Sequence, residues 1–297
     1  MKKEVLQVGE EGGNIRGISR EEIKEKMQEE IEPLLKSVRK HGFFSREGDN
    51  HLYYEKYVSS AAVRTVVICH GFNEHSEKYK EMIYYFYREY SNVYVLDHQG
   101  HGKSYRKVED HLVTHVENFN DYVEDLRMFM KIMVERESGK LPIILFGHSM
   151  GATIGATYLE KYPGDFRRAV FSSPMFEMNM TQTPKWLGRM IVDFKVMTGR
   201  KKNKKYLDYD VSYSWFKQSV LATRRLLRPE NMARIQVPVI VFEAEKDTIV
   251  KTEGHIRFVK GVRNAKLVVV PGGRHELFRE KDEILTPYLN KIFEFIG

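Results

Sequence analysis

Residues 141–162 read LPIILFGHSMGATIGATYLEKY, and this stretch decides the fold. The short apolar run Ile143–Phe146 predicts a buried parallel strand. A Gly-x-Ser-x-Gly pattern follows at once, and small residues at helical spacing then predict a helix. Gly147 and Gly151 let the strand and the helix pass close together, because a Cβ at either position would crowd the turn. The stretch therefore predicts a sharp strand–turn–helix unit that lifts the hydroxyl of Ser149 to its apex.

The remainder of the chain alternates apolar strand patterns with amphipathic helix patterns. We expect further strands at 65–69, 93–96, 169–172, 237–244 and 265–270. Helical patterns separate them, and a turn signal at 47–50 predicts an opening hairpin. This spacing predicts an α/β fold in which a mostly parallel sheet carries helices on both faces.

The alternation divides the chain into four segments. Residues 1–40 are interpreted as an N-terminal arm and helix, and residues 41–174 and 237–297 as the two parts of an α/β core. Residues 175–236 interrupt the alternation with helical patterns rich in methionine and aromatic residues, which predicts an inserted cap with an adaptable apolar pocket. The candidate substrate-binding residues are Met175, Phe176, Trp186, Met190 and Trp215. Taken singly, each also fits simple packing within the cap.

The composition is that of a globular protein. Of 297 residues, 42% are hydrophobic and 30% are charged. The single cysteine, Cys69, excludes an internal disulfide and fits a reducing compartment. No apolar stretch is long enough to span a bilayer, and the N-terminal MKKEVLQVGEEGG lacks the apolar core of a signal peptide. We therefore expect a cytoplasmic protein.

The net charge of +7 is concentrated in part in two basic runs. They comprise Arg200, Lys201, Lys202, Lys204 and Lys205, and then Arg224, Arg225 and Arg228. Such runs attract anionic lipid headgroups, so peripheral contact with the inner face of a membrane is one interpretation, and a solvated surface is the other. No nucleic-acid-binding motif accompanies the charge. The residues leave the oligomeric state open.

A serine hydroxyl becomes a nucleophile when a base removes its proton and a third group orients that base. In folds with this elbow, an acid and then a histidine follow the serine, each on a loop after a strand. His255 falls within a predicted helix, whereas His275 lies in a glycine-bearing loop after a strand, so we select His275. For the acid, Asp247 lies beyond its strand, whereas Glu243 lies inside it and Glu245 at its edge. We favour Asp247, for which capping of the next helix is the structural alternative.

Acyl transfer also needs two N–H donors aimed at the developing oxyanion. We expect the first from the backbone of Met150, directly after the serine. The second is expected from Phe72, in the loop after the strand at 65–69, where Gly71 permits the required backbone shape.

The sequence offers no convincing metal or cofactor site. His98 and His101 lie three residues apart beside Asp97, but hydrogen bonding within a loop explains them better than metal ligation. No phosphate-binding glycine loop occurs. The predicted chemistry therefore needs neither a metal nor a cofactor.

Five motifs together resemble the monoglyceride lipase and bacterial lysophospholipase group of α/β-hydrolases. They are HGFNEHSEKY (70–79), DHQGHGKS (97–104), GHSMG (147–151), VSYSWFKQ (211–218) and HELFREKD (275–282). The resemblance implies an α/β-hydrolase fold with a helical cap and a single-chain glycerolipid or similar ester as substrate. It also implies a triad of Ser149, Asp247 and His275, with Phe72 and Met150 as the oxyanion donors. Gln99 and Ala152 depart from the arginine and glycine usual in the group, which bears on loop packing.

These observations predict a cofactor-independent serine esterase that hydrolyses a lysophospholipid or a monoacylglycerol through an acyl-enzyme. A short-chain carboxylesterase and an aminopeptidase of the same fold are the alternatives. The aminopeptidase would need an acid in the cap, which is rich in lysine instead. A non-catalytic binding protein is a third hypothesis, although such proteins usually lack a triad member and all three positions are filled here.

Overall fold

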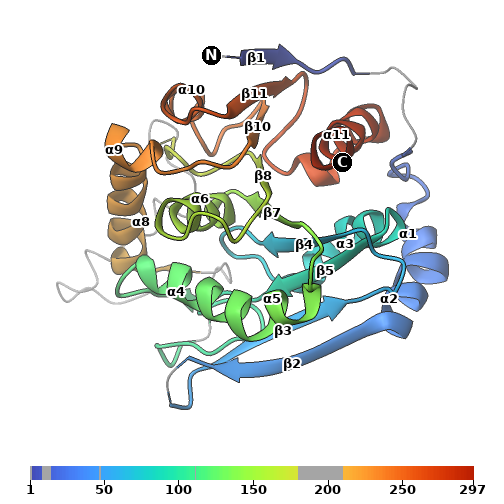
Figure 1. Cartoon of the computed structure of the whole chain (residues 1–297), viewed down its shortest axis with the longest axis horizontal. Helices are drawn as coiled ribbons and strands as arrows, with labels where there is room; N and C mark the ends of the chain where they lie inside the picture. Colours follow the sequence, from blue (N-terminus) through green and yellow to red (C-terminus); the bar gives the residue numbers. More distant parts are fainter. Residues whose placement is uncertain (1, 9–14, 47, 111, 180–209) are drawn as a thin grey trace, which may run out of the picture.

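The computed structural model of the chain describes residues 2–8, 15–46, 48–110, 112–179 and 210–297. Within these residues, nine strands form one sheet in the order β1-β11-β10-β8-β7-β4-β5-β3-β2 (Figure 1). The strands are β1 (Lys2–Val5), β2 (Arg39–Ser45), β3 (His51–Tyr57), β4 (Arg64–Cys69), β5 (Ser91–Leu96), β7 (Ile143–His148), β8 (Arg168–Ser172), β10 (Val239–Ala244) and β11 (Ala265–Val270).

The sheet is mostly parallel. Each pairing from β5 through β4, β7, β8, β10 and β11 to β1 is parallel, whereas β2–β3 and β3–β5 are antiparallel. The predicted α/β fold with an opening hairpin is therefore confirmed. Because parallel strands share one carboxyl edge, the loops after β4, β7, β10 and β11 meet at the same edge of the sheet.

Helices cover both faces of the sheet, as Figure 1 shows. They are α1 (Ile23–Lys26), α2 (Glu32–Val38), α3 (Lys80–Arg88), α4 (Asn120–Phe129), α5 (Glu135–Ser138), α6 (Met150–Lys161), α8 (Tyr213–Leu226), α9 (Pro229–Met232), α10 (Thr252–Gly261) and α11 (Asp282–Ile296). Single turns of 3₁₀ helix occur at Ser76–Tyr79 and Leu277–Arg279, and π-helical turns at Met27–Ile31 and Met130–Val134. A separate two-residue ladder joins β6 (Val113–Thr114) to β9 (Asp210–Val211).

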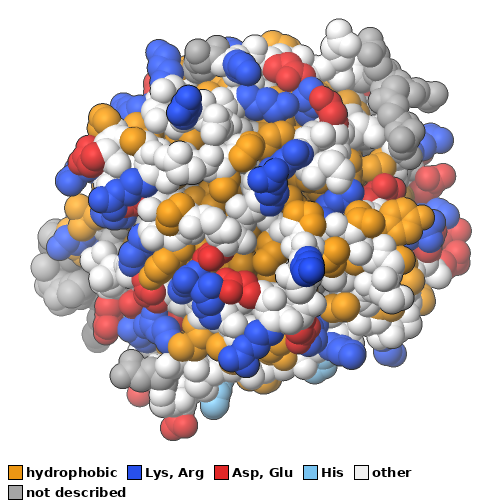
Figure 2. Space-filling model, in the orientation of Figure 1, with side chains coloured by type: hydrophobic (Ala, Val, Ile, Leu, Met, Phe, Trp, Pro, Cys, Tyr) orange, Lys and Arg blue, Asp and Glu red, His pale blue; other side chains and the backbone are white. Residues whose placement is uncertain are grey.

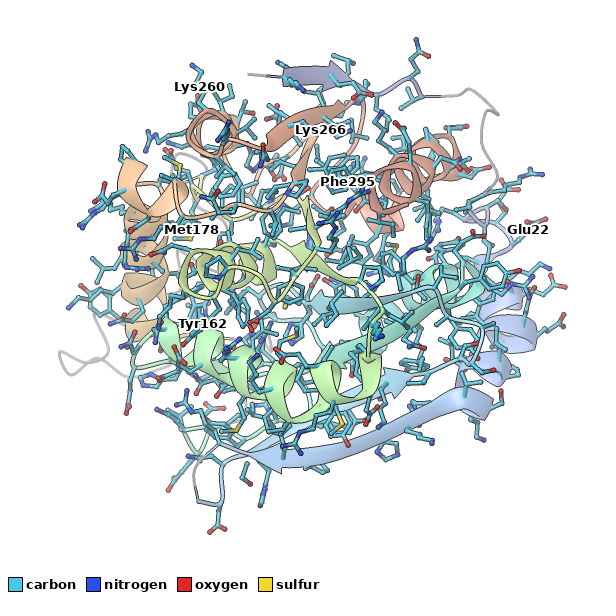
Figure 3. All side chains as sticks on the ribbon, viewed as in Figure 1. Glu22, Tyr162, Met178, Lys260, Lys266 and Phe295 are labelled. Carbon is cyan, nitrogen blue, oxygen red and sulfur yellow. The ribbon has the colours of Figure 1, made fainter. Side chains whose placement is uncertain are left out.

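Two apolar cores lie on opposite faces of the sheet, and side chains fill both layers (Figure 3). Successive strand residues point to opposite faces. Val67 therefore packs in the core shared with α4, α6 and α10, whereas Ile68 packs in the core shared with α3 and α11. Cys69 is fully buried at the end of β4, where burial raises the pKa of its thiol to about 12, and it serves as core packing.

The segment interpreted as an N-terminal arm and helix contributes a strand to the sheet. Residues Lys2–Val5 form the edge strand β1, which pairs with β11. The helix expected within residues 1–40 is interrupted by the π-helical turn at Met27–Ile31 and ends at Val38, directly before β2. Ile31 is fully buried in the core that contains α3 and α11, so one face of this segment packs against the sheet domain.

Part of the expected cap is described. Residues 175–179 leave the sheet after β8, and α8 and α9 return the chain to β10. Trp186, Met190 and the basic run at 200–205 lie outside the described residues. On the face seen in Figure 2, lysine and arginine side chains are spread among acidic and apolar ones. Among the described helices, none is both long and apolar enough to cross a membrane.

Candidate active site

The elbow between β7 and α6 presents Ser149 at the carboxyl edge of the sheet. Ser149 has φ 51° and ψ −117°, a left-handed conformation that a residue with a side chain rarely adopts. A Cβ on Gly151 would overlap the backbone carbonyl of Cys69, so only glycine fits there. The carbonyl of Ser149 accepts from the Met175 amide at 3.0 Å, and its amide donates to the Ser172 carbonyl at 3.1 Å. The stretch 172–175, at the end of β8 and directly after it, thus holds the strained turn in place.

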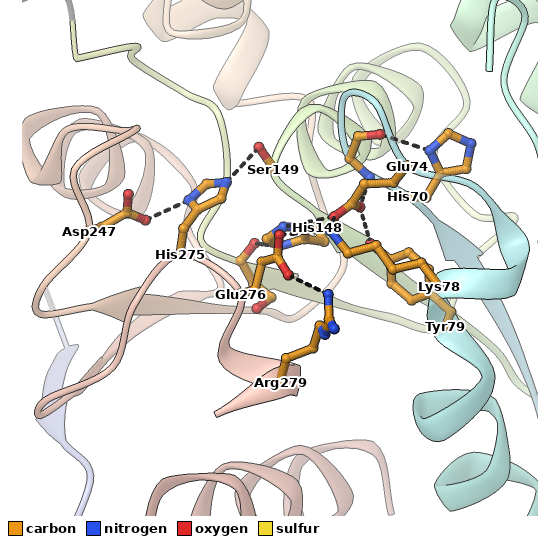
Figure 4. Close-up of polar contacts among 12 residues, drawn as sticks. His70, Glu74, Lys78, Tyr79, His148, Ser149, Asp247, His275, Glu276 and Arg279 are labelled. Atoms are coloured by element: carbon orange, nitrogen blue, oxygen red, sulfur yellow. Dashed lines mark hydrogen bonds and ion pairs between the residues drawn. The ribbon is translucent and has the colours of Figure 1, made fainter. Parts of the chain in front are cut away.

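Three side chains from three loops form one hydrogen-bonded chain at this edge (Figure 4). His275 Nε2 lies 3.0 Å from Ser149 Oγ, and His275 Nδ1 lies 2.7 Å from Asp247 Oδ2. A carboxylate only accepts, so Nδ1 carries the ring proton and Nε2 is left to accept the serine proton. The side chains are mostly buried, with 12% of His275 and 5% of Asp247 exposed. The structure thus brings together the serine, the histidine and the acid that the sequence selected.

The Asp247 carboxylate is held in its ionised form. Burial alone would raise its pKa, but the hydrogen bond and charge of His275 outweigh burial, and the net pKa lies below the usual value. Asp247 Oδ1 also accepts from the amides of Ile249 at 2.8 Å and Val250 at 3.2 Å. These bonds fix the carboxylate so that its second oxygen faces the imidazole.

The alternative residues have other partners. Glu245 accepts from the Gly272 amide at 2.8 Å. Glu243 faces His255 at 3.4 Å inside the fold, and His255 lies 2.9 Å from the Pro174 carbonyl. His255, Glu243 and Glu245 therefore make no hydrogen bond with the Ser149 hydroxyl.

The residues expected to donate to the oxyanion lie near the serine, Met150 in the chain and Phe72 in the same cavity. Met150 is the first residue of α6, so the hydrogen-bond ladder of the helix does not use its amide. Phe72 lies in the loop after β4, and Phe72 and Ser149 line the same cavity. The Gly71 amide donates to Glu74 Oε2 at 2.6 Å, which fixes the loop just before Phe72.

A cavity of about 280 Å³ opens at Ser149 and His275. Its apolar wall consists of Phe72, Met175, Met178, Trp215 and Ile249. Its polar wall consists of Asn73, Glu74, Lys78, His148 and Glu276. The cavity that contains the serine therefore has both apolar and polar lining, which suits an amphipathic ligand.

Of the candidate substrate-binding residues, the structure brings two to this cavity. Met175 and Trp215 line it, and the Trp215 ring lies 4.1 Å from that of Phe72. Phe176 does not line it, because its ring stacks on Phe258 at 4.2 Å and is buried in the core. The turn after Pro174 sends these neighbouring side chains in different directions. Trp186 and Met190 lie outside the described residues.

Histidines beneath the oxyanion loop support it. His70 and His98 lie 4.4 Å apart between ring centroids, and His70 Nε2 accepts from the His98 amide at 3.0 Å. The His101 ring packs edge-on against Phe72 at 5.8 Å. Burial lowers the pKa of His101 to about 3 and that of His98 well below its usual value, so both remain neutral. Over the described ranges, no group of three or more potential ligands could hold a metal ion.

Four residues near the serine were not selected from the sequence. Glu74, Lys78, Glu276 and His148 form a charged and hydrogen-bonded cluster against the triad (Figure 4). The His148 ring lies 4.9 Å from the His275 ring, and burial lowers the pKa of His148 to about 4. The motif at 70–79 contains Glu74 and Lys78, the motif at 147–151 contains His148 and the motif at 275–282 contains Glu276, so these motifs were the sequence signal that could have identified them.

The chain is similar in sequence and in fold to several known proteins. Residues 60–282 match the family described as serine aminopeptidase, S33. Lysophospholipase L2 of Escherichia coli K12 is 27% identical over 277 residues, covering 79% of this chain and 80% of that protein. Monoacylglycerol lipase of Mycolicibacterium smegmatis is 27% identical over 274 residues, which cover 85% of this chain and 96% of that protein. The solved structure of a soluble variant of Saccharomyces cerevisiae monoglyceride lipase, in complex with a substrate analog, has the same fold, with a TM-score of 0.70. The two chains are 16% identical, and the match covers 87% of this chain and 94% of that one.

Proposed function

Since this chain belongs to the serine aminopeptidase S33 family of α/β-hydrolases, we propose that it is a carboxylic ester hydrolase that acts on single-chain lipids. Its substrate is a monoacylglycerol or a lysophospholipid, the compound classes in the names of its relatives. The observation that carries the proposal is the continuous chain from Ser149 Oγ through His275 to Asp247. It gives the serine a base with a free acceptor nitrogen and gives the base a charged partner.

The reaction follows from these positions. His275 Nε2 accepts the Ser149 proton while Oγ attacks the ester carbonyl, and the carbonyl oxygen becomes an oxyanion facing the amides of Met150 and Phe72. Asp247 stabilises the imidazolium that forms. The imidazolium then protonates the leaving alcohol as the C–O bond breaks. Water, deprotonated by His275, attacks the acyl-enzyme, releases the fatty acid and regenerates the serine.

The two walls of the cavity support a lipid ester over a small acetate ester. The acyl chain lies along the apolar wall, where Met175 and Trp215 belong to the proposed cap, residues 175–236. The leaving alcohol faces the polar wall. Each methylene buried against the apolar wall contributes about 0.8 kcal/mol, so chain length strongly affects affinity.

A substrate panel tests the proposal. Esters from acetyl to oleoyl chains, glycerol and glycerophospho headgroups, and aminoacyl anilides would be compared for kcat/KM with the parent protein and the Ser149→Ala variant. We expect kcat/KM to rise with chain length, and we expect the variant to be inactive. Preference for acetyl esters contradicts the lipid assignment, and preference for aminoacyl anilides favours the aminopeptidase alternative.

We also propose peripheral contact with anionic membranes. Arg224 lies on α8 and Arg228 lies just after it, and both are exposed. Arg225, in contrast, donates two hydrogen bonds to the buried Glu160. One of the three cations of this basic run is therefore already paired within the fold. Sedimentation with anionic and neutral vesicles at low and high salt tests this, because electrostatic binding weakens with salt. Equal binding to neutral vesicles contradicts it.

A further inference from the structure

The Glu74 carboxylate joins the loops around the triad. It is 5% exposed, and its Oε2 accepts from the Gly71 amide and from the Tyr79 hydroxyl, each at 2.6 Å. Its Oε1 accepts from Lys78 Nζ at 2.6 Å and lies 3.8 Å from His148 Nε2. One buried carboxylate thus contacts both the oxyanion loop and the strand end that precedes the serine.

Lys78 extends this connection to the loop that carries the histidine. Its Nζ lies 2.6 Å from Glu74 Oε1 and 2.7 Å from Glu276 Oε1. Glu276 directly follows His275, and 198 residues separate it from Lys78 along the chain. Figure 4 shows the lysine between the two loops. The ammonium therefore links the segment that carries Phe72 to the segment that carries His275.

The buried charge of the Glu74 carboxylate is balanced by the Lys78 ammonium. Burial raises the pKa of Glu74, but the nearby His148 and Lys78 and the hydrogen bonds outweigh burial and lower the pKa to about 2. The carboxylate is therefore ionised at neutral pH. A buried charge that loses its partner is strongly unfavourable, so the carboxylate holds Lys78 in place. Lys78 is 22% exposed and lies at the polar wall of the cavity.

We propose that Lys78 is a positioning residue that sets the distance between the oxyanion loop and the histidine loop through Glu74 and Glu276. The proposal rests on the proposed ester hydrolysis. That reaction needs the donor amides and the imidazole to reach the same carbonyl at once, and a displacement of about 1 Å costs on the order of a hundredfold in rate. Lys78 acts through these groups and takes no part in bond making.

Three variants test the proposal. Lys78→Met removes the cation and keeps the length of the side chain, Glu276→Gln removes the charge at the far end, and Lys78→Arg restores a cation. Lys80→Met is the matched control, because Lys80 also makes a 2.7 Å ion pair, with Glu32, but away from the cavity. Each protein would be measured for kcat and KM on one ester and for its midpoint of thermal unfolding.

We expect Lys78→Met to lower kcat by about tenfold to a hundredfold, with KM changed less than about twofold. Glu276→Gln leaves the buried pair with Glu74 intact, so it should fold normally and still lower kcat by about tenfold. Lys78→Arg should recover kcat to within about threefold of the parent, and Lys80→Met should match the parent.

Two results overturn the proposal. One is a parent-like kcat in both Lys78→Met and Glu276→Gln. The other is a loss of kcat in Lys78→Met, with Glu276→Gln unaffected, that tracks loss of folded protein in the unfolding curves. An inactive parent protein would instead refute the proposed function, so the two failures are distinguishable.

Discussion

Replacing Asp247 by Asn tests the assignment of the acid. In the parent, Oδ2 accepts the Nδ1 proton of His275 at 2.7 Å, which leaves Nε2 as the acceptor facing Ser149. In Asp247→Asn, the carboxamide oxygen can keep the bonds from the Ile249 and Val250 amides, and its NH₂ then faces Nδ1. The ring must carry its proton on Nε2, which can no longer accept from the serine. The side chain keeps its shape while the base takes the wrong tautomer.

The expected cost follows from losing both the base and the charge. In triads of this kind the change lowers kcat by about 10⁴-fold, which corresponds to about 5.5 kcal/mol of transition-state stabilisation. The assay is hydrolysis of a chromogenic ester at saturating substrate and pH 8. Glu245→Gln is the matched control, because its amide oxygen can still accept from Gly272, and we expect parent-like kcat. The assignment is refuted if Asp247→Asn stays within tenfold of the parent while Glu245→Gln loses activity.

Three further predictions concern stability and specificity. The folded pKa of Glu74, about 2, lies below its ordinary value of 4.5, so ionised Glu74 stabilises the fold above pH 4.5 and loses this contribution as pH falls toward 2. The gap in unfolding free energy between parent and Glu74→Gln should therefore shrink by about 3 kcal/mol between pH 5 and pH 2, and a constant gap would contradict this. Gly151→Ala should lower the unfolding free energy by about 3 kcal/mol or more, because its Cβ meets the Cys69 backbone; an unchanged denaturant midpoint would be inconsistent. Trp215→Ala should raise KM for long-chain esters by at least about tenfold and leave acetyl esters within twofold, since the indole belongs to the apolar wall; equal effects on both would speak against that wall as the acyl site.

Local patterns explain why the sheet and the elbow were predictable. The run Ile143–Phe146 and the glycines after it describe both the strand and the turn, because their signals lie within a few residues of one another. Asp247 and His275 could be predicted from the sequence for a related reason. Parallel strands bring their carboxyl ends to one edge, so chain order alone restricts which acid and which histidine can meet the serine.

Features that depend on distant contacts were not predictable. Strand β1 reads KKEV and lacks an apolar signal, because as an exposed edge strand it buries little. Phe176 resembled a pocket residue by composition, yet the turn after Pro174 directs its ring into the core against Phe258. The bridge from Lys78 to Glu276 spans 198 residues, and no local pattern signals a pairing at that separation.

The most direct measurement of the central claim is labelling with a fluorophosphonate, followed by mass spectrometry of the digested protein. A serine activated by an adjacent imidazole reacts with this probe, whereas an ordinary serine does not. We predict one label per molecule, on the peptide containing Ser149, and its loss in His275→Ala. A folded parent protein that stays unlabelled at Ser149, or one that is labelled equally well without the imidazole, would contradict the account.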